Sequence, residues 1–382
     1  MKMKWIADNV RNAPPSALDR LMNIKHKDVI SLTLGEPDFD TPEHIIKAGI
    51  EALKTKCTHY TSNLGILKLR EAIAEKLEKE NNFKVDPESE IMVTCGAGTA
   101  IDLLMRAVLN PGDEVIVQDP GYFNYIYISA FIDAKLVPLH VKEANDFSLK
   151  PEELEEKITK KTKLLVLNSP ENPTGSVISE KDLRRIADIA MENDFLVLTD
   201  EIYEKLIYDE KHFSIASIPE MKERCVLING FSKAYAMTGW RVGYIAGCKE
   251  IINKMGMMGV YTQICAPAVS QMAALEALKG DQKCVEEMRK EYNKRRLYAV
   301  KRLNEIGIPT VMPKGAFYVF PNISEYGSSE EVWKLFLEKA KVSTTPGTAF
   351  GKHGEGYLRL SYANSLENIE RALDSIEAMI KK

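Results

Sequence analysis

Lys233 and Arg241 lie on one segment that follows the apolar, strand-like run 225–229. Lys233 stands among apolar and small neighbours, and burial in such surroundings disfavours the charged form of a lysine. A neutral amine can attack an aldehyde and hold it as a Schiff base. An arginine close by can hold a phosphate through two parallel hydrogen bonds. Pyridoxal 5'-phosphate (PLP) carries both an aldehyde and a phosphate, so the pair predicts a PLP site.

Two further motifs place polar side chains where apolar runs end. In 168–175 (NSPENPTG) the prolines and glycine impose a fixed turn, which would hold Asn172 as a rigid amide donor. Asp200 ends the run 195–199, and a buried carboxylate there needs a cationic partner such as a protonated pyridine nitrogen. Tyr203 follows on the next turn and could donate to the 3'-oxygen of the ring. Taken singly, a surface turn and a helix N-cap would also explain Asn172 and Asp200.

The small-residue stretch 95–100 joins a strand pattern to a helix pattern. Free N–H groups at a helix start bind anions, so this stretch could hold a phosphate. Gly96 and Gly98 also open like a dinucleotide-binding fingerprint, with Asp119 at about the right distance. Ile101 occupies the third glycine position, where its bulk would obstruct close packing of helix on strand. The stretch therefore favours a phosphate site over a dinucleotide site.

Tyr122 and Arg359 complete the candidate set. Tyr122 follows a strand pattern and could stack on a flat ring, although an ordinary packed tyrosine is the alternative. Arg359 alternates with apolar residues in 357–362 and suits a substrate carboxylate, although a structural salt bridge would also explain it. The turn-rich loops 34–42 and 58–65 demand no chemistry by residue type alone.

The elements that must position these residues alternate between short apolar runs and helical periodicity. Strand patterns cover 90–94, 114–117, 163–167, 195–199, 226–228 and 242–246, and helical patterns cover 100–109, 180–193 and 251–258. This alternation predicts an α/β fold with a mostly parallel sheet, whose active groups lie beyond the carboxyl ends of the strands. A long helix over 284–306 then leads into strand and helix patterns typical of a smaller α+β domain.

The composition of the chain argues against several classes of function. The 382 residues, 45% of them hydrophobic, suffice for a large core and two domains. A net charge of −4 with no long basic run argues against nucleic-acid binding. We expect no signal peptide, because charged residues interrupt the N-terminal segment, and no apolar stretch long enough to span a membrane. The six scattered cysteines indicate reduced thiols in the cytoplasm, and neither they nor the six histidines have metal-ligand spacing.

In their order along the chain, these motifs resemble those of the class I and II aminotransferases, a family of fold-type I PLP enzymes. The resemblance covers nearly the whole chain. It is strongest to the prokaryotic and archaeal aspartate and aromatic aminotransferases, through the strings GEPDFDTP at 35–42, NPTG at 172–175, MTGWR at 237–241 and KGAFY at 314–318. It implies a large domain with a seven-stranded, mostly parallel sheet over 45–283 and a small α+β domain over 284–382. Residues 1–44 would form an arm that belongs to the small domain.

The resemblance also implies a role for each candidate. Lys233 would form the Schiff base with PLP, and Asp200 would pair with the pyridine nitrogen; together with Tyr203 they would be the catalytic residues. The other implied contacts are Tyr203 and Asn172 at the 3'-oxygen, Tyr122 on the ring, Ala97, Gly98 and Arg241 at the phosphate, and Gly35, Asn172 and Arg359 at the substrate carboxylate. Tyr60 would reach the phosphate bound by a partner subunit, which implies a homodimer. Two positions differ from part of the family: Gly230 lies where some members have a phosphate-binding serine, and Tyr122 lies where other members have tryptophan.

We therefore expect ping-pong transamination from aspartate or an aromatic amino acid to 2-oxoglutarate. Alanine or 2-aminoadipate as donor and another PLP reaction, such as C–S lysis, are the alternatives, because the fold alone does not choose between them. A PLP-dependent regulator would need a DNA-binding domain, for which there is no room before Gly35. Ser16, Arg106 and Tyr261 are candidates for contacts with the substrate side chain.

Overall fold

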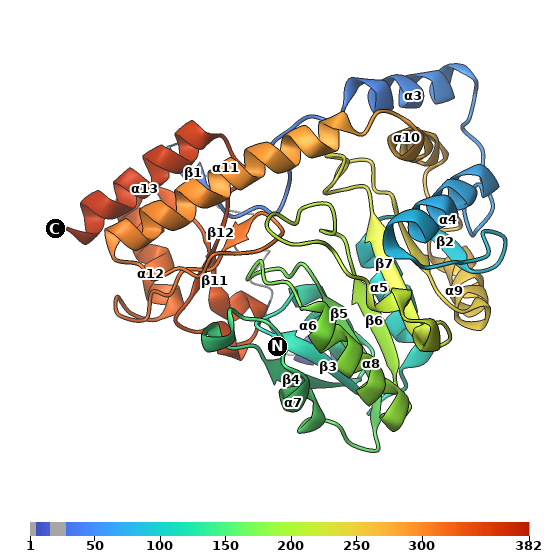
Figure 1. The fold of residues 1–382 in the computed structure, drawn as a ribbon, viewed down its shortest axis with the longest axis horizontal. Helices are drawn as coiled ribbons and strands as arrows, with labels where there is room; N and C mark the ends of the chain where they lie inside the picture. Colours follow the sequence, from blue (N-terminus) through green and yellow to red (C-terminus); the bar gives the residue numbers. More distant parts are fainter. Residues whose placement is uncertain (1–4, 16–27, 382) are drawn as a thin grey trace.

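The computed structural model describes residues 5–15 and 28–381. Its centre is a seven-stranded sheet with the order β2-β8-β7-β6-β5-β3-β4 (Figure 1). The strands are β2 (Ile91–Thr94), β3 (Glu114–Asp119), β4 (Lys135–His140), β5 (Thr162–Asn168), β6 (Leu196–Asp200), β7 (Cys225–Gly230) and β8 (Gly243–Ala246). All neighbouring strands run parallel except β8, which is antiparallel to both β2 and β7. The predicted α/β fold with a mostly parallel sheet is confirmed.

The strands bury both of their faces. Leu165, Val197 and Leu227 belong to one hydrophobic cluster, whereas their sequence neighbours Leu164 and Leu198 belong to another. Because side chains alternate along a strand, the two clusters are the two faces of the sheet. The first face is covered by α4 (Leu67–Asn81), α8 (Glu180–Asn193) and α10 (Ala268–Lys279), and the second by α5 (Ala97–Val108), α6 (Phe123–Phe131) and α9 (Lys249–Thr262).

Strand β4 was not predicted from the sequence. Pro138 lies in its middle, pairs with Val117 of β3 and cannot donate a hydrogen bond to a further strand. The strand tolerates this proline because it lies at the edge of the sheet.

The C-terminal part is built on the long helix α11 (Lys283–Ile306), which ends at Gly307 in the left-handed conformation. It packs with β9 (Tyr318–Val319), β12 (Leu358–Ser361) and α13 (Leu366–Ile380) around a separate hydrophobic cluster. Strand β11 (Thr345–Pro346) pairs with β12. The helix predicted over 284–306 is confirmed to within one residue. Helix α12 (Ser329–Leu335) is followed directly by a π-helical turn (Phe336–Ala340).

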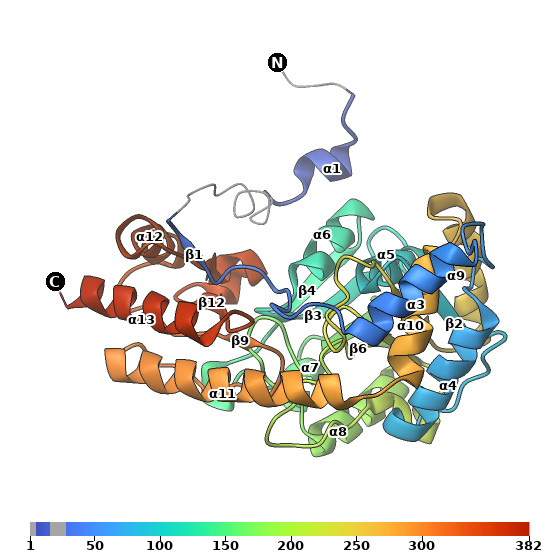
Figure 2. The same ribbon diagram turned by 90° about the horizontal axis from the view of Figure 1, so that it is seen from above.

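Segments near the N-terminus join both parts of the molecule (Figure 2). Strand β1 (Ile30–Ser31) pairs in parallel with β10 (Val342–Ser343) of the C-terminal part. The short helix α1 (Asp8–Asn12) lies against α6, and α3 (Glu43–Lys54) packs on α10. Residues 34–42 between β1 and α3 therefore cross from one part to the other.

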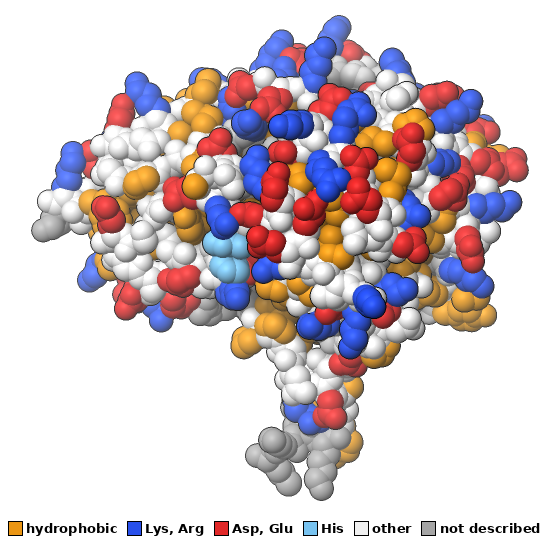
Figure 3. Space-filling model, turned by 60° about the horizontal axis from the view of Figure 1, so that its bottom comes forward, with side chains coloured by type: hydrophobic (Ala, Val, Ile, Leu, Met, Phe, Trp, Pro, Cys, Tyr) orange, Lys and Arg blue, Asp and Glu red, His pale blue; other side chains and the backbone are white. Residues whose placement is uncertain are grey.

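Charges of both signs are intermixed on one face of the molecule. Lys and Arg side chains lie intermixed with Asp and Glu across the face shown in Figure 3. Of the helices within residues 5–15 and 28–381, none is both long and apolar enough to cross a membrane.

Candidate active site

A cavity of about 240 Å³ lies beyond the carboxyl ends of the central parallel strands. It brings together residues that are far apart in the sequence, as the rule for α/β sheets predicts. Ten of the eleven predicted site residues line it: Gly35, Ala97, Gly98, Tyr122, Asn172, Asp200, Tyr203, Lys233, Arg241 and Arg359. The eleventh, Tyr60, does not line this cavity, and its side chain is 78% exposed.

Lys233 reaches the cavity from the turn that follows β7. Its Nζ donates a hydrogen bond to the carbonyl oxygen of Gly35 at 2.5 Å. Burial lowers the pKa of Lys233 to about 8, and the positive charges of Arg359 and Arg241 act in the same direction against the charge of Glu36. An amine with this pKa is partly neutral near neutral pH, which makes it both a nucleophile and a proton acceptor.

Asp200, the last residue of β6, supplies a carboxyl group in the same cavity. Its Oδ2 accepts a hydrogen bond from the hydroxyl of Tyr125 at 2.7 Å, and its Oδ1 accepts one from the backbone N–H of Ile202 at 3.2 Å. Burial raises the pKa of Asp200 to about 6, although both hydrogen bonds favour the ionised form. A cation placed beside this carboxyl group would stabilise its charge.

Tyr125, which contacts Asp200 but does not line the cavity, is a candidate site residue that the sequence analysis did not name. The ring of Tyr125 lies edge-on to that of Tyr122, with 5.6 Å between the centroids. The spacing of three residues at the start of a helix places both tyrosines on one side, so helical periodicity from 122 onward could have revealed the pair.

Arg359 reaches the cavity from β12 and is 4% exposed. Its Nη1 donates to Oδ1 of Asn172 at 2.8 Å, its Nη2 donates to the carbonyl oxygen of Thr33, and its Nε has no partner. None of the ion pairs found between described residues involves this guanidinium. A structural salt bridge, the alternative left open by the sequence, is therefore absent from the described part of the chain. A buried cation without an anion is suited to an anionic ligand.

Two more tyrosine hydroxyl groups meet in the cavity. The hydroxyl oxygens of Tyr203 and Tyr318 lie 2.7 Å apart, and the guanidinium of Arg359 stacks 4.5 Å from the Tyr318 ring centroid. A Cβ added to Gly35 would lie 2.1 Å from the Tyr318 hydroxyl, so only glycine allows this close approach. Tyr318 is a second residue that the sequence did not indicate, because its string KGAFY shows no chemistry by itself.

The opposite end of the cavity is formed by the start of α5 and by Arg241. Ala97 and Gly98 are the first residues of this helix, so their N–H groups have no partner within the helix. The Arg241 guanidinium lies against Gly96, where a Cβ would be 2.6 Å from Nη2. Among the described residues, its hydrogen bonds go to the carbonyl oxygens of Cys95 and Thr238. The free N–H groups of a helix start and a guanidinium are the groups that bind a phosphate in proteins.

Steric crowding explains why position 230 is a glycine. A Cβ there would lie 3.1 Å from Cα of Gly243 on the neighbouring strand and 3.2 Å from Cδ1 of Ile202. Ser232, which also lines the cavity and was not predicted, offers a hydroxyl group beside Lys233 instead.

The candidates for side-chain recognition fall outside the cavity or outside the described residues. Arg106 pairs with Asp102 on the surface of α5 at 2.9 Å, and Tyr261 is 87% exposed on α9; neither lines the cavity. Ser16 lies outside the described residues.

The donor set fits PLP in composition. An amine for the aldehyde, a carboxyl group for the ring nitrogen, and a guanidinium with a helix start for the phosphate surround one cavity, and a second guanidinium remains for a substrate carboxylate.

Comparisons with known proteins agree with this geometry. A family profile described as "Aminotransferase class I and II" matches residues 27–376. The chain is 48% identical to an aspartate aminotransferase of Pyrococcus abyssi, over 99% of this chain and 98% of the relative. It is 44% identical to the aromatic-amino-acid aminotransferase 2 of Thermococcus litoralis, over 99% and 98%. Among solved structures, it superposes on an aromatic aminotransferase from Pyrococcus horikoshii with a TM-score of 0.91 at 47% identity, covering 96% of this chain and 99% of that one. It also superposes on an aspartate aminotransferase from Thermus thermophilus with maleate, with a TM-score of 0.94 at 38% identity, covering 99% and 100%.

Proposed function

Because the chain belongs to the class I and II aminotransferase family and is an aminotransferase, we propose that it uses PLP to move the amino group of aspartate or an aromatic amino acid to 2-oxoglutarate by a ping-pong mechanism. The observation that carries the proposal is the meeting of Lys233, Asp200, Arg241 and Arg359 around one cavity. An amine, a carboxyl group and two guanidinium groups with no acidic partner among the described residues match the groups of PLP and of an amino acid.

Each residue has a defined task in this proposal. Arg241, Ala97 and Gly98 hold the phosphate, Tyr122 stacks on the ring, and Asn172 and Tyr203 donate to the 3'-oxygen. When bound, PLP supplies an aldehyde for the amino group and a ring that accepts electrons from the substrate Cα. Asp200 keeps a proton on the ring nitrogen, since its buried carboxyl group is stabilised in the ionised form by a cation.

Lys233 moves the proton of the reaction. Its Nζ, with a pKa of about 8, takes the proton from the substrate Cα as a general base. Arg359 holds the substrate α-carboxylate by a forked pair of hydrogen bonds, with Asn172 and Gly35 beside it. This clamp fixes the Cα–H bond relative to the Lys233 amine, which is the orientation on which proton transfer depends.

We further propose a homodimer with shared active sites. Large apolar side chains remain exposed on α3, on α9 and near Tyr60, among them Leu53, Met257 and Tyr261. Exposed side chains of this kind mark an association surface. Tyr60 of the partner subunit would then reach the phosphate site, and Tyr60→Phe should weaken PLP binding without changing the mass of the assembly measured by light scattering.

The domain division stays part of the proposal, with an arm over 1–44, a PLP-binding domain over 45–283 and a small domain over 284–382. The cytoplasmic location indicated by the cysteines likewise stays a prediction.

The lining of the cavity bears on whether the amino donor is an aromatic amino acid or aspartate. Apart from Lys233, Arg241 and Arg359, no described residue that lines the cavity carries a positive charge. Leu34, Ile101 and the aromatic lining favour an aromatic side chain. Aspartate would need a further cation for its second carboxylate. Alanine and 2-aminoadipate as donors, and C–S lysis as reaction, remain the alternatives to be tested.

The first test is the visible absorption spectrum of the purified protein before and after the separate addition of aspartate and tyrosine. A Schiff-base band that disappears with one of them supports transamination and identifies the donor class. A band that persists with both moves the substrate or the reaction elsewhere. The absence of any band after PLP is added would refute the role of Lys233.

A further inference from the structure

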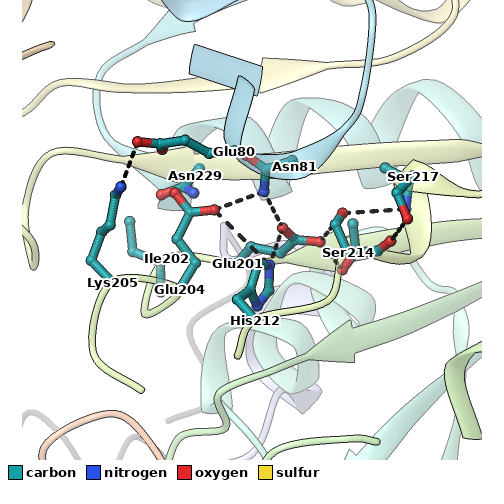
Figure 4. A network of polar contacts seen from close by, with 12 residues as sticks. Glu80, Asn81, Glu201, Ile202, Glu204, Lys205, His212, Ser214, Ser217 and Asn229 are labelled. Carbon is teal, nitrogen blue, oxygen red and sulfur yellow. Dashed lines mark hydrogen bonds and ion pairs between the residues drawn. The ribbon is translucent and has the colours of Figure 1, made fainter. Parts of the chain in front are cut away.

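The segment that carries Asp200 and Tyr203 into the cavity directs two other side chains away from it. Glu201 and Glu204 do not line the cavity and enter a buried polar network on the far side of the segment (Figure 4). Glu201 is 1% exposed, and the side chain of Glu204 is 7% exposed. Two carboxyl groups buried this deeply need hydrogen-bond donors or cations beside them.

The carboxyl group of Glu201 is saturated with contacts from three segments. Its Oε1 accepts hydrogen bonds from the hydroxyls of Thr199 at 3.0 Å and Ser214 at 2.6 Å. Its Oε2 accepts one from Nδ2 of Asn81 at 2.9 Å and lies 2.6 Å from Nε2 of His212. Burial alone would lower the pKa of His212, but the charge and hydrogen bond of Glu201 outweigh it and raise the pKa.

Glu204 is tied to α4. Its carboxyl group pairs with Nζ of Lys76 and accepts a hydrogen bond from Nδ2 of Asn81 at 2.7 Å. Lys76 in turn donates to Oδ1 of Asn81 at 2.7 Å. Burial works to raise the pKa of Glu204, yet the charges of Lys76 and His212 and these hydrogen bonds bring it to about 2.

The same residues have the composition of a metal site, because ligand atoms of Glu201, Glu204 and His212 lie within 4.8 Å of one another. The network already contains its cation, however, since the Lys76 ammonium pairs with Glu204. The amide nitrogen of Asn81 also donates to both carboxyl groups, where an ion would have to bind. The negative charges of the two carboxyl groups are therefore balanced by side chains, without a metal ion.

We propose that Glu201, Glu204 and His212 are positioning residues, which hold the turn after β6 so that Asp200 and Tyr203 face the cavity. Strand β6 ends at Asp200, and the backbone N–H of Glu201 still donates to the carbonyl oxygen of Ile228 on β7 at 2.9 Å. The next strand-like pairing of the chain is the bridge between Ile207 and Gly315, so the turn between these two points depends on side-chain contacts. The network anchors it to α4 on one side and to the segment 212–214 on the other. This inference rests on the proposed function, because Asp200 and Tyr203 need exact placement only if they contact PLP.

The test compares two variants designed to keep the fold. Glu201→Gln keeps the size of the side chain but presents an amide N–H₂ to donors that need an acceptor. The double variant Lys76→Met/Glu204→Gln removes the ion pair without leaving a lone buried charge. Glu210→Gln on the same loop is the matched control, because its side chain is 36% exposed and, among the described residues, forms its ion pair with Lys314.

Hydrogen exchange of the PLP-free protein is the first readout. We expect faster exchange in peptides covering 199–214 of both test variants, and wild-type exchange there in Glu210→Gln. The second readout is the pH midpoint of the Schiff-base band with PLP bound, which we expect to shift in both test variants. We also expect kcat/KM to fall about tenfold or more, because small displacements of catalytic groups are costly.

Wild-type exchange, pH midpoint and kcat/KM in both test variants would overturn the inference. So would one equivalent of zinc retained by the purified wild-type protein and lost in Glu201→Gln, because the cluster would then be a metal site. A wild-type protein without any Schiff-base band refutes the proposed function instead, and the exchange of the PLP-free protein still reports on the anchoring of the turn.

Discussion

Arg359→Lys separates the shape of the carboxylate clamp from its charge. The wild-type guanidinium donates to Asn172 with one nitrogen and to Thr33 with another, and its Cζ lies over the Tyr318 ring, 4.5 Å from the centroid. A lysine at this position keeps the positive charge but offers neither the fork nor the flat surface. The variant should therefore bind a carboxylate with one hydrogen bond in place of two, and it leaves Oδ1 of Asn172 without its donor.

The expected loss follows from the groups involved. A hydrogen bond to a charged group contributes about 1.5–3 kcal/mol, and an unsatisfied buried acceptor costs about 1–3 kcal/mol. Allowing for partial relaxation of the lysine chain, we expect a loss of about 2–4 kcal/mol in transition-state binding, or about 30- to 1,000-fold in kcat/KM. Loss of the α-carboxylate contact should affect every amino acid donor alike.

The assay is the rate at which the Schiff-base band disappears in single-turnover reactions with aspartate and with tyrosine. Arg302→Lys is the control, because Arg302 pairs with Asp374 and Glu377 far from the cavity. A loss smaller than about threefold, well below what even one charged hydrogen bond contributes, would refute the assignment of Arg359 to the substrate carboxylate. A loss confined to aspartate would instead place Arg359 at a second carboxylate.

Three further predictions concern Lys233, which lines the cavity, and two buried residues that do not line it, Tyr125 and Glu171. Lys233→Ala should abolish the Schiff-base band and leave almost no turnover in a coupled assay, and normal turnover would end its role as the amine. Tyr125→Phe removes a hydrogen bond to Oδ2 of Asp200, so kcat/KM should fall about tenfold and PLP should dissociate more readily; unchanged PLP affinity by fluorescence titration would contradict this. Glu171 is buried and its pKa is raised from 4.5 to about 8 by burial, against hydrogen bonds from Thr174 and Ser176. The folded state therefore holds this proton more tightly than the unfolded chain, and the free energy of unfolding should decline from about pH 4.5 to pH 8. Glu171→Gln should flatten that decline in urea titrations, and an equally steep decline in the variant would contradict the assignment.

The sequence predicted those parts of the site in which a local pattern carries the information. Each of Asn172, Asp200 and Lys233 follows an apolar run with strand character, and the carboxyl ends of parallel strands meet at one edge of the sheet. This topology alone brings the three residues together. The start of α5 was predictable for the same reason, because small residues between a strand and a helix expose N–H groups.

Residues whose position depends on packing between distant segments could not be predicted in this way. Tyr318 meets Tyr203 only because the C-terminal part folds over the end of the sheet. Gly230 is explained by the approach of β8, which a strand pattern does not reveal. Strand β4 was missed because Pro138 is unfavourable in a central strand and acceptable only at an edge, and strand order is a property of the folded chain.

The charges of the cavity show how stability and function are coupled in this chain. Arg359 is buried without an acidic partner among the described residues, and its charge, after burial itself, is the largest cause of the lowered pKa of Lys233. An unpaired buried cation destabilises the folded chain, because its lost hydration is not replaced by an anion. The same cation keeps the Lys233 amine partly neutral before any ligand arrives. An incoming carboxylate would neutralise Arg359, so ligand binding should stabilise the fold. It would also remove the repulsion that holds the pKa of Lys233 down. The affinity of the amine for a proton should therefore rise once the substrate is in place, when the amine has a Cα proton to accept.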